Sequence, residues 1–208
     1  MTGSLGAFTL VIGGYFVGAI PFGVLVGRFA GGVDLREHGS GRTGATNALR
    51  TVGPLPAVLV FALDAAKGAA VVMLVGWLYV AGPAGSPPWV AAAVGFAAIA
   101  GHIRSVFIGF RGGRGVATFA GAMLAIAPLV LVLVVPVVAL VVWRTRYVSL
   151  GSLTGTLLAP PVAAVLAAFG QAGWQAAALA LGGALLVTWA HGDNIARLRA
   201  GTERRIGA

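Results

Sequence analysis

Three short polar stretches could carry chemistry in a chain that is otherwise strongly apolar. They are rich in Gly, Arg, Ser, Thr, Asn and His, and they cover residues 39–50, 101–118 and 191–203. Glycine lets the backbone curl its N–H groups around an anion, and arginine adds a guanidinium fork that matches phosphate. These residue types at this spacing predict a site for phosphate-bearing molecules.

The first stretch combines three glycines with neutral and charged hydrogen-bond donors. Its side chains could surround an anion, and Arg42 adds positive charge to the same loop. The alternative is a plain glycine-rich loop in which Thr46 or Asn47 caps a short helix. We favour the anion site, and its candidate residues are Gly39, Ser40, Gly41, Thr46, Asn47 and Arg50.

The second stretch places glycines around two arginines immediately before an apolar segment. Backbone N–H groups, a helix N-terminus and guanidinium groups would then meet at one place, which favours phosphate binding. The stretch is not a P-loop, since no Gly-Lys-Ser/Thr follows. Arginines that only anchor the membrane orientation are the alternative, but this leaves the glycines unexplained. The candidate residues are Arg111, Gly112, Gly113, Arg114 and Gly115.

These two stretches share a six-residue pattern. Gly41-Arg42-x-x-Ala45-Thr46 in the first matches Gly113-Arg114-x-x-Ala117-Thr118 in the second. The pattern suggests two related anion loops.

The third stretch brings His191 and Asn194 three residues apart, so that they would share a face if a helix continued past Ala190. A single histidine at a helix end is more often structural. Asp64 and Lys67 are also three residues apart, inside an apolar segment where charges are costly unless paired. We favour a structural ion pair that borders the cavity over a catalytic role for these two residues.

The elements that position these stretches must lie in a membrane. Of 208 residues, 59% are hydrophobic and 9% are charged, against about 25% charged in a soluble domain. Charge-free runs such as 1–27, 69–103 and 115–143 exceed the ~20 residues that cross a bilayer. Because no basic residue precedes Arg28, the first run is expected to remain a span rather than a cleaved signal peptide. The chain has no cysteine, which excludes disulfides and thiolate chemistry.

The net charge of +9 could indicate nucleic-acid binding, but the basic residues lie between apolar segments. Such placement is typical of cytoplasmic loops. A single span over 115–143 would put six arginines on the external face, so we expect a break near Ala127 and Pro128. The charge-free loop 81–88 would be external. The predicted helices cover 5–29, 55–80, 89–101, 115–127, 128–143, 150–169 and 174–190.

The prediction is therefore an all-α integral membrane protein of seven transmembrane helices, several of them short, in a single domain over 1–208. The N-terminus would lie outside and the C-terminus inside. Short or broken helices in a bilayer need a protein-lined cavity to satisfy their backbone groups.

Together the three motifs resemble the bacterial acyl-phosphate:glycerol-3-phosphate acyltransferases, the PlsY family. Ile20-Pro21-Phe22-Gly23 and Leu63-Asp64-x-x-Lys67-Gly68 complete the match, which covers essentially the whole chain in order. The resemblance implies a seven-helix inner-membrane enzyme of phospholipid synthesis. It would transfer a fatty acyl group from acyl phosphate to the sn-1 hydroxyl of glycerol 3-phosphate, which forms lysophosphatidic acid and phosphate.

The resemblance also implies that the reaction needs no cofactor and no metal, and that the active site faces the cytoplasm of a bacterial cell. The partners would be the two substrates and membrane lipid, with no nucleic acid. The soluble enzyme that produces acyl phosphate is a candidate protein partner. The catalytic positions implied are Ser40, Arg50, His191 and Asn194. Glu203 matches an acidic residue that supports the structure or the site.

The chain departs from the family pattern at several positions. Arg111 and Arg114 stand where the family usually has phosphate-binding lysines, Arg42 replaces an Asn and Ser105 replaces a Pro. Charge is retained, but arginine and lysine bind phosphate with different geometry, which leaves turnover and donor preference open.

The expected chemistry relies on proximity and charge neutralisation, because both substrates are phosphate anions. Ser40, Asn194 or the backbone N–H groups of 39–41 are candidate donors to the acyl oxyanion. We expect a substrate phosphate to accept the hydroxyl proton, with His191 holding substrate by hydrogen bonds.

Two other functions remain open at this point. A small transporter for a phosphate-bearing solute would need polar residues through the bilayer and openings on both faces, whereas the predicted external loops carry no charge. A related protein that binds substrate without turnover is the other. The membrane acyltransferases that use His-x-x-x-x-Asp are disfavoured, since none of His38, His102 and His191 has Asp five residues later.

Overall fold

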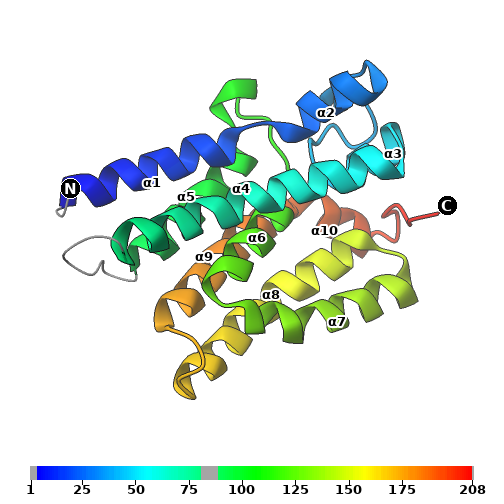
Figure 1. Ribbon diagram of the computed structural model, residues 1–208. Coiled ribbons are helices and arrows are strands. Elements are labelled where there is room, and N and C mark those ends of the chain that lie inside the picture. The colour runs from blue at the N-terminus through cyan, green and yellow to red at the C-terminus, as the bar shows by residue number, and fades with distance from the viewer. Residues whose placement is uncertain (1–3, 81–88, 208) are drawn as a thin grey trace.

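The computed structural model describes residues 4–80 and 89–207, which form a bundle of helices with no β-strand among them (Figure 1). The predicted external loop 81–88 lies outside the described residues. The helices are α1 (Ser4–Ala19), α2 (Phe22–Gly31), α3 (Ala45–Thr51), α4 (Pro54–Val80), α5 (Trp89–Ile103), α6 (Val116–Ile126), α7 (Pro128–Thr145), α8 (Val148–Ala168), α9 (Trp174–Ala190) and α10 (Gly192–Arg199). Two 3-10 turns, η1 (Leu35–Glu37) and η2 (Val106–Ile108), lie in the loops.

The predicted break between the fourth and fifth segments is confirmed. Helix α6 ends at Ile126, and α7 begins at Pro128, which occupies the first turn of the new helix. Proline is well placed there because its missing N–H would have no intrahelical partner. As expected, α6 is short, at 11 residues.

The prediction of one helix over 5–29 is wrong, because the chain breaks at Ile20 and Pro21. Proline disfavours the helical conformation of the residue before it and cannot donate a backbone hydrogen bond. The freed carbonyl groups find partners elsewhere in the bundle. Ser105 Oγ donates to Ala19 O, and Lys67 Nζ donates to Ile20 O at 3.0 Å.

Helices α1 and α5 approach each other backbone to backbone through small residues. A Cβ atom at Gly18 would overlap the backbone of Ala98, and one at Gly101 would overlap the carbonyl of Tyr15. Close approach of this kind drives helix association in lipid, because apolar side chains gain little free energy when they move from lipid into the protein. Glycine is therefore required at these two positions by packing.

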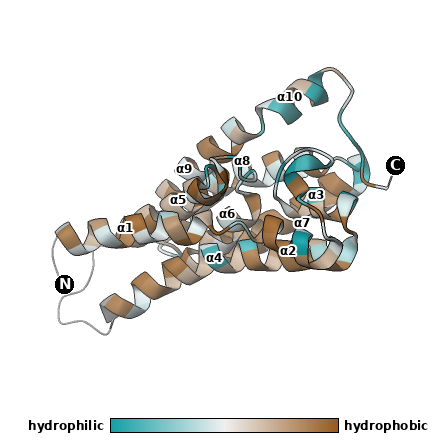
Figure 2. Cartoon of the chain, turned by 90° about the horizontal axis from the view of Figure 1, so that it is seen from above, coloured by the Kyte–Doolittle hydropathy of each residue, from teal (hydrophilic) through white to brown (hydrophobic). Residues whose placement is uncertain are grey.

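The outer surface of the bundle is apolar, as a lipid-facing surface must be. Within residues 4–80 and 89–207, five helical segments are long and apolar enough to cross a membrane, and α6 and α9 are shorter apolar helices. In α7 only 11% of the residues are buried inside the protein. Hydrophilic residues gather at the end of the bundle where α2, α3 and α10 lie, away from the N-terminus (Figure 2). The number of spans and their orientation stay predictions.

Candidate active site

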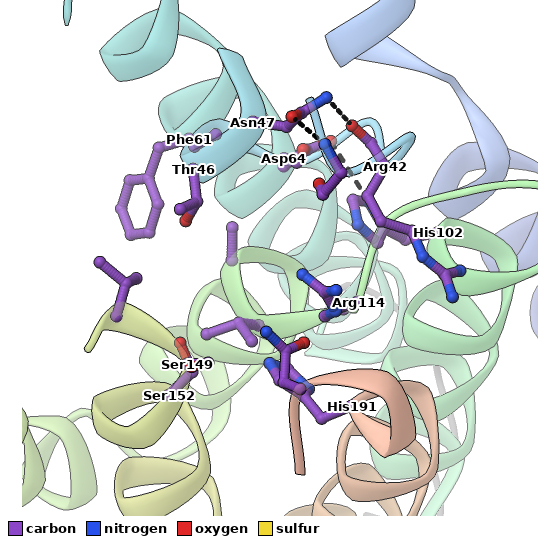
Figure 3. A pocket seen from close by; sticks show the side chains of 18 of the residues that line it. Arg42, Thr46, Asn47, Phe61, Asp64, His102, Arg114, Ser149, Ser152 and His191 are labelled. Atoms are coloured by element: carbon purple, nitrogen blue, oxygen red, sulfur yellow. Dashed lines mark hydrogen bonds and ion pairs between the residues drawn. The ribbon is translucent and has the colours of Figure 1, made fainter. Parts of the chain in front are cut away.

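A pocket at the polar end of the bundle is lined by residues from all three polar stretches (Figure 3). Residues of loop 39–44 and of α3 supply one wall, residues 114–117 at the start of α6 another, and the junction of α9 and α10 a third. The predicted site residues that line it are Ser40, Thr46, Asn47, Arg50, Asp64, Arg114, Gly115, His191, Asn194 and Glu203. Segments far apart in sequence therefore converge on one site.

The first loop is organised by the side chain of Asn47, which is 2% exposed. Its Nδ2 donates to the carbonyl oxygens of Leu35, His38 and Arg42 at 2.8, 3.0 and 2.9 Å. Its Oδ1 accepts from the backbone N–H of Ser40 at 2.8 Å. The Asn47 amide is thus used entirely by the loop, so it positions the site rather than offering a free group to substrate.

Neither Thr46 nor Asn47 caps a helix. Helix α3 begins at Ala45, and Gly44 is its N-cap. Both side chains therefore lie within the first turn of the helix, where Thr46 faces the pocket.

Two backbone N–H groups that could have bound an oxyanion are already engaged. Ser40 N donates to Asn47, and Gly41 N donates to His38 O at 3.0 Å. Gly39 and Gly41 do not line the pocket; they have φ angles of +59° and +66°, which bend the loop in a way that favours glycine. Of residues 39–41 only Ser40 lines the pocket, so its hydroxyl is the donor that this segment offers to a ligand there.

The second loop is held by backbone hydrogen bonds to the end of α5. Gly112 N donates to Ile103 O and Gly113 N to His102 O, both at 3.2 Å. A Cβ atom at Gly113 would overlap the imidazole ring of His102. Gly112 and Gly113 lie outside the pocket lining, and they allow the loop to lie against α5. Gly115, with φ +84°, is the N-cap of α6.

The two predicted arginines of the second loop have different positions. Arg114 projects into the pocket with 16% of its side chain exposed, and its Nη2 lies 2.7 Å from Asp193 Oδ2. Its buried Nε has no hydrogen-bond partner in the described part of the chain. Arg111 is exposed and outside the pocket, because the chain reaches the pocket lining only at Arg114.

His191 is the junction between two helices, not a residue of a continuous one. Helix α9 ends at Ala190 and α10 begins at Gly192. The Nδ1 atom of His191 lies 2.8 Å from Val187 O, so Nδ1 carries the proton and Nε2 is an acceptor. Burial, together with the charge of Arg114, lowers the pKa of His191 to about 4. The imidazole is therefore neutral at physiological pH.

Glu203 accepts hydrogen bonds from three side chains, one in α8 and two in α10. Its Oε1 accepts from Asn194 Nδ2 at 2.7 Å and from Ser149 Oγ at 2.9 Å, and its Oε2 accepts from Arg197 Nε at 2.7 Å. Burial alone would raise the pKa of Glu203, but these hydrogen bonds outweigh it and lower the pKa below its usual value. Glu203 thus fixes Asn194 so that its buried Oδ1, which has no partner among the described residues, remains an acceptor.

Asp64 and Lys67 form the predicted ion pair, with Lys67 Nζ 2.7 Å from Asp64 Oδ1 and both side chains 2% exposed. His102 joins them, since its Nδ1 lies 3.4 Å from the same oxygen. Asp64 and His102 line the pocket, whereas Lys67 reaches the break between α1 and α2. The ion pair therefore connects the pocket, through Asp64, with the break between α1 and α2, through Lys67.

Sequence reasoning missed the contribution of α8 to this pocket, and that of Phe61 in α4. Ser149 and Ser152 line it from the first turns of α8, and Val148 and Phe61 add apolar surface. In Figure 3 Phe61 lies beside Thr46, on the side away from Arg114. No local sequence signal marks these positions, because serine and valine are ordinary residues of an apolar helix.

Comparisons with known proteins agree with this architecture. The family model described as glycerol-3-phosphate acyltransferase matches residues 8–201. A glycerol-3-phosphate acyltransferase of Synechococcus sp. (strain JA-3-3Ab) is 47% identical, with 98% of this chain and 95% of that protein covered. One from Thermus thermophilus is 44% identical, with coverage of 93% of this chain and 92% of that protein.

Two solved structures are also similar. The crystal structure of PlsY (YgiH), an integral membrane glycerol 3-phosphate acyltransferase, in its glycerol 3-phosphate form superposes with a TM-score of 0.85 at 37% identity, over 97% of this chain and 96% of that one. Its lysophosphatidic acid form gives a TM-score of 0.83 at 35% identity over the same shares. The integral membrane fold and the resemblance are thereby confirmed, and the chain belongs to the glycerol-3-phosphate acyltransferase family.

Proposed function

We propose that this protein, as one domain over 1–208, transfers a fatty acyl group from acyl phosphate to the sn-1 hydroxyl of glycerol 3-phosphate. The products are lysophosphatidic acid and phosphate. The observation that carries the proposal is the pocket in which three arginines, two hydrogen-bond acceptors and an apolar wall meet. The similar PlsY structures, with glycerol 3-phosphate and lysophosphatidic acid, support this substrate and product.

The arginines match the two phosphate groups of the substrates. Arg42 and Arg50 approach the pocket from the first stretch, and Arg114 approaches from the second. Guanidinium groups in a partly buried site neutralise the four or so negative charges of two phosphates more strongly than in bulk water. They hold two anions together that would otherwise repel each other, which supplies proximity.

The acceptors match the hydroxyl groups of glycerol. His191 Nε2 and Asn194 Oδ1 both accept hydrogen bonds, because Val187 and Glu203 engage the opposite side of each group. An acceptor pair selects a ligand that carries hydroxyl donors, as glycerol 3-phosphate does. With a pKa of about 4, His191 is a weak base, so its role is to orient the attacking hydroxyl.

The transfer step needs no protein nucleophile. The sn-1 oxygen attacks the acyl carbonyl carbon, the bond from that carbon to the phosphate oxygen breaks, and the hydroxyl proton passes to a phosphate oxygen. The Ser40 hydroxyl donates to the developing acyl oxyanion, since the backbone N–H groups beside it are engaged. The acyl chain extends over Phe61 and Val148 toward lipid.

The same reasoning extends to orientation and partners. We assign seven spans with the pocket on the cytoplasmic side of the bacterial membrane, because the basic loops and the site share the polar end of the bundle. Glycerol 3-phosphate then reaches the pocket directly from the cytoplasm. The soluble enzyme that makes acyl phosphate is the candidate partner on that side.

The proposal is tested by purifying the full chain in lipid and measuring phosphate release with acyl phosphate plus glycerol 3-phosphate. We expect release that depends on both substrates and is not matched when acyl-CoA replaces acyl phosphate. Ser40→Ala, Arg50→Ala and His191→Ala should each lose more than about 90% of the rate, a factor of ten or ~1.4 kcal/mol in the barrier. Folded wild-type protein that releases no phosphate would refute the assignment.

A further inference from the structure

A second cavity lies beside the proposed acyl-transfer pocket and shares two residues with it. Arg50 and Glu203 line both cavities. The rest of the second wall comes mainly from the C-terminal tail, including Arg204 and Arg205, with Tyr147 at the start of α8. The acyl transfer described above assigns no role to this cavity or to these two tail arginines.

The tail that forms this wall is anchored, not loose. Ile206 N donates to Arg146 O at 2.9 Å, and Arg205 Nε donates to the Tyr147 hydroxyl at 3.2 Å. The Arg205 guanidinium also lies 5.3 Å from the centre of the Tyr147 ring, within the range of a cation–π contact. Glu203 fixes the start of the tail through its three hydrogen bonds. The cavity is therefore built by specific contacts.

The lining carries more positive charge than its own carboxylate balances. It holds Arg50, Arg204 and Arg205 against Glu203 alone. The carboxylate of Glu203 is already engaged by the guanidinium of Arg197, outside this cavity. Neither Arg204 nor Arg205 forms an ion pair within residues 4–80 and 89–207. Arg50 reaches the tail, since its Nη2 donates to Arg204 O at 3.4 Å, and burial together with the nearby charge of Arg204 lowers the pKa of Arg50.

We propose that this second cavity binds a phosphate group and that Arg50 contacts phosphate in either cavity. The inference rests on the proposed function, because that reaction supplies two soluble ligands of this chemistry. One is glycerol 3-phosphate on its way in, and the other is inorganic phosphate on its way out. A cluster of guanidinium groups at the mouth of a buried site raises the local concentration of such anions.

A binding measurement tests the site without relying on turnover. Equilibrium dialysis with radiolabelled inorganic phosphate uses the full chain in nanodiscs of neutral lipid. Wild-type protein should bind one phosphate more per chain than Arg204→Gln/Arg205→Gln binds. Arg199→Gln is the matched control, since Arg199 is exposed and lines neither cavity. Equal numbers of bound phosphates in wild type and in the double variant would overturn the proposal.

A conservative variant separates charge from damage to the tail. Arg204→Lys/Arg205→Lys keeps both charges, so it should retain the second site, and its melting temperature should match that of the Gln variant. If the Lys variant loses the second site as completely as the Gln variant, positive charge is not the determinant and the proposal fails.

Kinetics then distinguish the two sources of the phosphate group. If the cavity receives glycerol 3-phosphate, the Gln variant should raise KM for that substrate about five-fold, with a smaller change in kcat. If the cavity holds the leaving phosphate, the same variant should weaken product inhibition by inorganic phosphate by about the same factor. No change in either constant would overturn the inference, whereas absence of transfer in wild type would refute the proposed function and leave the dialysis result standing.

Discussion

The two glycine–arginine loops of the pocket share a sequence pattern but are held in different ways. In the first loop, the side-chain amide of Asn47 binds three carbonyl groups and one N–H. In the second, the backbone N–H groups of Gly112 and Gly113 donate to carbonyl groups at the end of α5. The arginines differ as well, since Arg114 is paired with Asp193, whereas Arg42 forms no ion pair in the described part of the chain.

This difference shows that loops with the same local sequence pattern can be stabilised by different contacts. The first loop depends on the chemistry of a single side chain that lies five residues after Arg42. The second depends on the absence of side chains where the loop touches the ring of His102. The loops should therefore fail under opposite kinds of substitution.

Gly113→Ala should have the largest effect. The added Cβ atom overlaps His102, so the loop and Arg114 must move. We expect kcat/KM to fall more than about 100-fold, or ~2.7 kcal/mol in transition-state stabilisation. Gly76→Ala in α4 is the control, because a Cβ there meets no atom within 4 Å. A Gly113→Ala enzyme of normal rate would mean that the second loop is not held by this close approach.

Asn47→Asp should disable the first loop, because it removes the amide donors and places a carboxylate beside three carbonyl oxygens. Aspartate keeps the shape and the acceptor but has no N–H for the three carbonyl groups, which costs about 2–4 kcal/mol of stability in a buried site. We expect a lower melting temperature and roughly 30-fold slower transfer, or ~2 kcal/mol. Gln171→Glu makes the same chemical change at an exposed position. Equal melting temperatures for the two variants would contradict the role of Asn47.

Exchanging the arginines for lysine compares the two loops directly. Arg114→Lys should lower kcat/KM about 10-fold, since lysine cannot keep the pair with Asp193 and also present a fork to phosphate. Arg42→Lys should cost about two-fold, because this unpaired charge can shift toward substrate. Steady-state kinetics with varied glycerol 3-phosphate measures both. The comparison breaks down if Arg42→Lys is the more damaging change.

The smallest expected effect is a change in stability with pH. His191 lines the same pocket as Arg114 of the second loop, and its pKa of about 4 lies below the usual value of 6.5. The folded state therefore binds fewer protons than the unfolded state between these values, so stability is complete above pH 6.5 and declines as pH falls toward 4. Thermal unfolding from pH 7 to 4.5 should show a shallower decline for His191→Gln, by a few degrees. Parallel curves would show that His191 is not buried in its neutral form.

The sequence predicts a helix break well where the signal is clear. The break at Ala127 and Pro128 follows from a proline inside the apolar run and from the placement of arginines after it. The break at Pro21 is masked in the sequence by the long apolar run around it. Its partners, Lys67 and Ser105, come from other parts of the chain, which no window of residues along α1 reveals.

The site shows the same division. Residue type and spacing predict that Ser40, Arg114 and His191 belong to one site, and all three line the pocket. They do not show that Arg111 points away, or that Ser149 meets Glu203 across 54 positions of the chain. Those facts depend on how separate helices end against each other, which only the packed bundle determines.

The glycine contact between α1 and α5 also bears on how the protein is made. Gly18 and Ala98 are about 80 residues apart in the chain, and synthesis at about 5–20 residues per second separates their emergence by roughly 4–16 s. Lys67 and Ser105, which bond the carbonyl groups at the end of α1, also emerge later than α1. During biosynthesis the first helix therefore waits in the membrane without its main partner, and its assembly is completed only by later segments of the chain.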